Sequence, residues 1–153
     1  MHSKIEHLSN AEKKLVLNAP ILVTALIAGA DGDFHPDEIK QAVKIIHIKT
    51  FSETRDVSGV YKSLDGHSEE LIDELISHLP KSATERNKML VEQLQGLNEI
   101  FPKLDENFAR DLHHSLRELA YYVSNASDLG IAYHSDQEKE YVKLDFLNVS
   151  KAG

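Results

Sequence analysis

The sequence contains no cysteine among its 153 residues. This absence excludes disulfide bonds, cysteine-ligated zinc, thiolate-bound iron–sulfur clusters and a thiol nucleophile. Basic residues are in the minority, because 17 Lys and Arg stand against 25 Asp and Glu, for a formal net charge of −8. Binding to a phosphate backbone needs a basic footprint, so nucleic acid is not an expected partner. An acidic chain instead suits cations or basic protein partners.

A membrane-spanning run is also missing. The apolar stretch Ile21 to Ala28 is far shorter than the roughly 20 apolar residues that cross a bilayer, and Pro20 and Asn18 precede it. The first residues, MHSKIEHLSNAEKK, lack the charged and apolar regions of a signal peptide. We therefore expect a cytoplasmic protein that does not insert into a membrane.

Strand signals are absent as well, since neither period-two alternation nor an Asn-Gly hairpin turn occurs. Apolar residues recur instead at intervals of three and four, and 41% of all residues are hydrophobic, enough to bury a core. We expect an all-α chain in which residues 1–153 form a single domain, a compact bundle of about seven helices. The expected helix starts are Ser9, Pro36, Asp56, Ser68, Ser82, Asp105 and Ser135.

The first helix is expected to be the centre of the bundle. From Ile21 to Ala28 it is apolar on every side except at Thr24, which is typical of a helix surrounded by others. Ser9 and Glu12 have the spacing of a capping box at its start. Pro20 lies inside the apolar pattern, so the sequence predicts either one helix kinked near Pro20 or two helices that meet there.

Two later helices carry clear apolar stripes. The helix that Ser68 is expected to cap has five apolar residues that we expect to face the core: Leu71, Ile72, Leu75, Ile76 and Leu79. The helix after Ser82 carries Leu90, Leu94, Leu97 and Phe101 on one face, and we expect Pro102 to end it.

An acidic turn, Asp31-Gly32-Asp33, separates the central helix from the helix that opens at Pro36. Asp31, Gly32, Phe34 and Glu38 match the second half of a calcium-binding EF-hand loop. The first half does not match, because its first and third ligand positions fall on Ile27 and Gly29, which offer no side-chain oxygen. A standard EF-hand is therefore excluded.

A looser cation site at this junction stays open. The last carbonyls of the central helix carry partial negative charge, and carboxylates beside them suit calcium or magnesium, while His35 would suit a transition metal. A weak internal echo near the end of the chain predicts that a second acidic junction joins the first. The candidate ligands are Asp31, Asp33, Glu38, Asp128, Asp136 and Glu138. The alternative is that these acids serve only turns and helix caps.

The stretch LIAGADGDFHPDE resembles the TerB-like family, the tellurite-resistance TerB proteins and related helical domains. The matching residues are Ala28, Ala30, Asp31, Gly32, Phe34 and Glu38, and at the second junction Ser135 and Glu138. The resemblance implies a compact helical domain with an acidic face, for which metal binding has been proposed, and a link to stress response and membrane-associated complexes. The second junction departs from the family, since it lacks Asp-Gly and follows a long loop from Ser127 to Tyr133.

No catalytic signature occurs: the sequence contains no nucleophile elbow, no P-loop, no dinucleotide-binding glycine pattern and no His-Glu-x-x-His motif. We therefore expect a non-enzymatic, TerB-like module that binds an unidentified protein partner in stress-response or envelope-associated signalling. The alternative function is divalent-cation binding or sensing at the Asp31–Glu38 junction. Tyr121 and Tyr122 are either part of a partner surface or part of the core.

Overall fold

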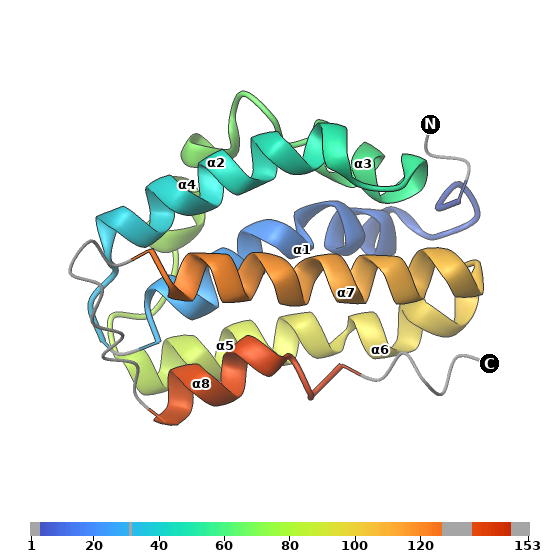
Figure 1. Ribbon diagram of the computed structural model, residues 1–153. Coiled ribbons are helices and arrows are strands. Elements are labelled where there is room, and N and C mark those ends of the chain that lie inside the picture. The colour runs from blue at the N-terminus through green and yellow to red at the C-terminus, as the bar shows by residue number, and fades with distance from the viewer. Residues whose placement is uncertain (1–3, 31, 127–135, 148–153) are drawn as a thin grey trace.

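The computed structural model describes residues 4–30, 32–126 and 136–147, and every regular element in these residues is helical (Figure 1). The all-α prediction is therefore confirmed. The elements are α1 (Asn10–Ala28), α2 (Pro36–Ser52), α3 (Arg55–Lys62), α4 (Ser68–Ser77), α5 (Ala83–Gln95), α6 (Leu97–Ile100), the 3-10 helix η1 (Phe101–Lys103), α7 (Glu106–Ser124) and α8 (Asp136–Lys143). None of these helices is long and apolar enough to cross a membrane.

The central position of α1 is confirmed. All residues from Ala19 to Ala28 are buried, and α1 contacts each of the other described α-helices. In Figure 1, α7 lies in front of α1, α2 lies above it and α5 lies below it. A helix that is apolar all round needs neighbours on every side, and the bundle supplies them.

The start of α1 has the predicted capping box, because the Ser9 side chain accepts from the Glu12 N–H and the Glu12 side chain accepts from the Ser9 N–H. Pro20 lies within one continuous helix, so the two-helix alternative is wrong. The buried Thr24 hydroxyl donates to the Pro20 carbonyl at 2.9 Å, which satisfies the one polar side chain in this apolar stretch.

Two predicted helix boundaries are wrong. His67, rather than Ser68, is the N-cap of α4, and Ser68 is the buried first residue of the helix. The single helix predicted between Ser82 and Pro102 is interrupted at Gly96, where α5 ends and α6 begins, and Pro102 lies inside η1. Proline is tolerated in the first turn of a helix, where a backbone donor has no partner to lose.

Polar side-chain contacts link α2, α3 and α7 on one side of the bundle. The buried Lys49 ammonium lies 3.2 Å from Glu53 and 3.0 Å from Glu118, which links α2 to α7. The Tyr61 hydroxyl lies 2.8 Å from the Ser115 hydroxyl, and burial raises the pKa of Tyr61. These three helices all contact one another.

Candidate functional site

The junction between α1 and α2 is built around two glycines and one aromatic ring. Gly32 has a φ of 125°, a conformation that side chains rarely adopt. At Gly29 a Cβ would lie 2.5 Å from the Phe34 ring, so only glycine allows the ring this close. The junction is therefore shaped by the close approach of Phe34 as well as by its turn.

The Arg86 side chain of α5 fills this junction. Its guanidinium donates to the Gly29 carbonyl at 2.8 Å and to the Gly32 carbonyl. It also stacks on the Phe34 ring, with Cζ 4.4 Å from the ring centroid. The neighbouring Asn87 amide donates to the Ala30 carbonyl at 3.2 Å. Both side chains are buried, so α5 supplies donors to the carbonyls that follow the end of α1.

Arg86 brings a positive charge of its own to this acidic junction. Burial lowers the pKa of Arg86, and the nearby Asp33 charge opposes that effect. An arginine guanidinium nevertheless stays protonated in proteins. Carbonyl oxygens at the C-terminal end of α1, which would attract a metal cation, here face a guanidinium instead.

The predicted metal ligands do not form a group among the residues that the structure describes. Asp33 is exposed, whereas Glu38 is buried, with Oε2 4.0 Å from Nε2 of His35. Asp31 and Asp128 lie outside the described residues, as do the side chains of Asp136 and Glu138 in α8. In the described part of the chain, no three His, Asp or Glu side chains are placed to hold a metal ion. The cation site stays a prediction from the sequence.

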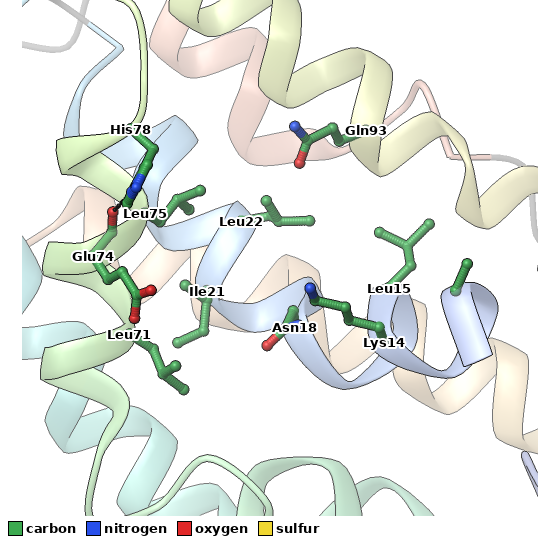
Figure 2. Close-up of a pocket in the computed structure, with 11 residues that line it drawn as sticks. Lys14, Leu15, Asn18, Ile21, Leu22, Leu71, Glu74, Leu75, His78 and Gln93 are labelled. Atoms are coloured by element: carbon green, nitrogen blue, oxygen red, sulfur yellow. Dashed lines mark hydrogen bonds between the residues drawn. The ribbon is translucent and has the colours of Figure 1, made fainter.

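A groove of about 620 Å³ lies along α1, between α4 and α5 (Figure 2). Its lining contains both apolar and polar side chains. The apolar residues are Leu15, Ile21, Leu22, Leu71 and Leu75, and the remaining ones are Ala11, Lys14, Asn18, Glu74, His78 and Gln93. Three helices therefore contribute to one concave surface.

The groove exists because α4 and α5 both pack on α1 but do not contact each other. The apolar stripe of α4 is also wider than the surface that covers it. Of the five residues predicted to face the core, only Ile72 is fully buried, and the other four are half-buried. Leu71 and Leu75 line the groove, where Figure 2 shows them facing the apolar residues of α1.

A histidine–aspartate pair lies elsewhere on the surface. Nδ1 of His47 lies 3.0 and 3.1 Å from the two carboxylate oxygens of Asp65, and its ring meets the exposed Phe51 edge-on. This pair ties α2 to the turn before α4. No third acidic, histidine or cysteine residue joins it within the described ranges, so it forms no metal-binding group.

Sequence reasoning missed Arg86 and the groove. One signal for Arg86 was available, since it stands four residues before Leu90 on the apolar stripe of α5. A charged residue at a stripe position predicts a buried charge with nearby partners. The groove had no such signal, because the width of the stripe on α4 does not show which part of it a neighbour covers.

Comparisons with protein-family models, curated proteins and solved structures found no match to this chain. The resemblance to TerB-like domains therefore stays a prediction that rests on the residues at the two junctions.

Proposed function

We propose that this chain is a non-enzymatic, TerB-like helical module that binds a protein partner by docking a helix of that partner in the groove between α1, α4 and α5. The observation that carries the proposal is the partial exposure of the half-buried Leu71 and Leu75 within a concave surface. The resemblance to TerB-like domains supports a stress-response or envelope-associated setting for this interaction.

The composition of the groove supports docking. Its lining combines leucine and isoleucine side chains with polar ones, and protein interfaces combine apolar and polar groups in the same way. A free apolar groove keeps Leu71 and Leu75 in contact with water. A partner that covers them gains the free energy of their burial without any rearrangement of α4.

The shape of the molecule supports a helix as the bound element. A peptide that adds a strand needs a sheet edge, and the described residues form no sheet. A polyproline segment needs an aromatic-lined groove, and a phosphopeptide needs an arginine cluster; the groove lining contains neither. The apolar face of an amphipathic helix fits a groove whose three walls are themselves helices.

Site-specific photocrosslinking in the native cell tests this proposal. A photoreactive residue replaces Lys14 or Gln93 at the groove, and matched controls replace the exposed Lys44 of α2 or Lys88 of α5. We expect both groove positions to crosslink to the same partner through a segment with an apolar helical stripe. Equal crosslinking at the control positions, or no adduct at the groove positions, would contradict the proposal.

The alternative function, divalent-cation binding or sensing at the Asp31–Glu38 junction, stays a prediction. Its support is the exposed Asp33 carboxylate beside the C-terminal end of α1. The Arg86 guanidinium at the same carbonyls weighs against it, because a second cation would be repelled there.

A further inference from the structure

We infer that the helix docked in this groove carries basic residues along the flank that faces α4, an inference that rests on the proposed function. The groove alone selects an apolar stripe. The charges beside the groove then determine which amphipathic helices can place their apolar stripe in the groove.

One wall of the groove is strongly acidic. Between Ser68 and Ser77, α4 carries four carboxylates and no basic residue. These carboxylates belong to Glu69, Glu70, Asp73 and Glu74. All four side chains are exposed, and none of them makes an ion pair with another described residue. A partner that approaches this wall therefore meets negative charge that the chain itself leaves unneutralised there.

Two of these carboxylates belong to the groove side of α4. Glu74 lines the groove together with Leu71 and Leu75, as Figure 2 shows. Glu70 stands one turn before Glu74 and so shares its side of the helix. Glu69 and Asp73 do not line the groove, and each points about 100° away from the carboxylate that follows it in the sequence.

The opposite end of the groove differs in charge. Lys14 of α1 lines that end, is exposed and makes no ion pair with a described residue. Asn18 and Gln93, which also line the groove, are uncharged. Charge complementarity therefore predicts Lys or Arg on the flank of the bound helix that faces Glu70 and Glu74, and it permits an acidic residue near Lys14.

The same charges disfavour an acidic occupant. An acidic helix would bring its carboxylates against Glu70 and Glu74, and like charges across an interface reduce both affinity and the rate of association. The excess of acidic over basic residues in the whole chain, 25 against 17, acts in the same direction at longer range.

Two designed peptides test the inference. Each has about 18 residues, long enough to form a helix, and both carry the same leucine stripe. One peptide has Lys and the other has Glu along one flank of the stripe. Binding of each to the full chain is measured by fluorescence anisotropy at low and moderate salt.

Matched charge reversals of α4 supply the controls. The variant E70K/E74K reverses the groove side, and E69K/D73K makes the same change in net charge away from the groove. All four positions are exposed, and thermal melting followed by circular dichroism verifies that both variants fold. A general effect of net charge would act equally in the two variants, whereas contact with the groove flank acts only in E70K/E74K.

We expect the wild-type chain to bind the Lys-flanked peptide about tenfold more tightly than the Glu-flanked peptide, with a difference that shrinks as salt rises. E70K/E74K should reverse this preference, and E69K/D73K should largely keep it. Equal binding of both peptides, or the same response in both variants, would overturn the inference and leave helix docking intact. Failure of both peptides to bind would count against helix docking itself.

Discussion

The guanidinium of Arg86 lies over the Phe34 ring, with Cζ 4.4 Å from the ring centroid, at the point where α1 turns toward α2. The same guanidinium donates to two carbonyls of that turn. One side chain of α5 thus holds both the backbone and the aromatic residue of the acidic junction. This contact gives the junction a structural role that requires no metal ion.

Replacing Arg86 with Met should destabilise the fold by about 2 to 4 kcal/mol, because the Gly29 and Gly32 carbonyls lose charged donors while remaining partly enclosed. Arg86→Lys should recover only part of the loss, since an ammonium lacks the planar fork that reaches two carbonyls and stacks on a ring. Urea unfolding measures the change. Lys88→Met, at an exposed position of the same helix, is the control, and an equal loss there would contradict the assigned role.

Replacing Gly29 with Ala should destabilise the fold by about 1 to 3 kcal/mol through overpacking, because the new Cβ meets the Phe34 ring at 2.5 Å. The double variant G29A/F34A separates this clash from the effect of the backbone. If the clash is the cause, the double variant loses less stability than the two single variants predict together. Strict additivity in urea unfolding would assign the cost of Gly29→Ala to another source.

Cation binding at the junction is tested by the melting temperature with calcium, magnesium or zinc, each compared with a chelator. A ligand that binds only the folded state raises the melting temperature as its concentration increases. If the predicted site exists, Asp33→Asn should reduce the shift, while Asp73→Asn, at an exposed position of α4, should leave it unchanged. An unchanged melting temperature at millimolar metal would contradict cation binding at ordinary metal concentrations.

Removing the half-buried imidazole of His113 should flatten the dependence of stability on pH. Burial lowers the pKa of His113, an effect that the hydrogen bond to the Leu144 carbonyl partly offsets. Above the unfolded pKa near 6.5 the imidazole is neutral in both states and costs nothing. As the pH falls below that value the unfolded chain gains the proton first, so the folded chain loses stability.

We therefore expect wild-type stability to fall between pH 7 and pH 5.5 more steeply than that of His113→Gln, as measured by urea unfolding. His67→Gln, which removes an exposed imidazole at the start of α4, is the matched control for the loss of a histidine. A His113→Gln chain with an unchanged slope would show that this imidazole takes up its proton equally in both states.

The sequence allowed the helices and the central position of α1 to be predicted, because both depend on local patterns. Ser9, Glu12 and Asp105 signal helix starts through their own side chains, and all three make the expected capping bonds. The N-cap of α4 and the break between α5 and α6 at Gly96 were missed, because they depend on tertiary packing rather than on the local residue type.

The groove and the contacts of Arg86 could not be predicted from local sequence patterns, because both depend on residues far apart in the chain. Arg86 meets Gly29 across 57 positions of the chain, and no short-range pattern encodes that meeting. Likewise, the stripe of α4 shows how much apolar surface the helix offers, while the separation of α4 from α5 decides how much of it stays open. Both features follow from how whole helices are placed on α1.

Methyl-resolved NMR tests the central claim, helix docking in the groove, most directly. The Lys-flanked peptide is titrated into a chain with labelled leucine and isoleucine methyl groups. We predict saturable shifts at Leu15, Leu71 and Leu75, which line the groove, and unchanged signals at the exposed Ile48 of α2. Shifts centred on Ile48, or unchanged groove methyl groups at saturating peptide, would contradict the claim.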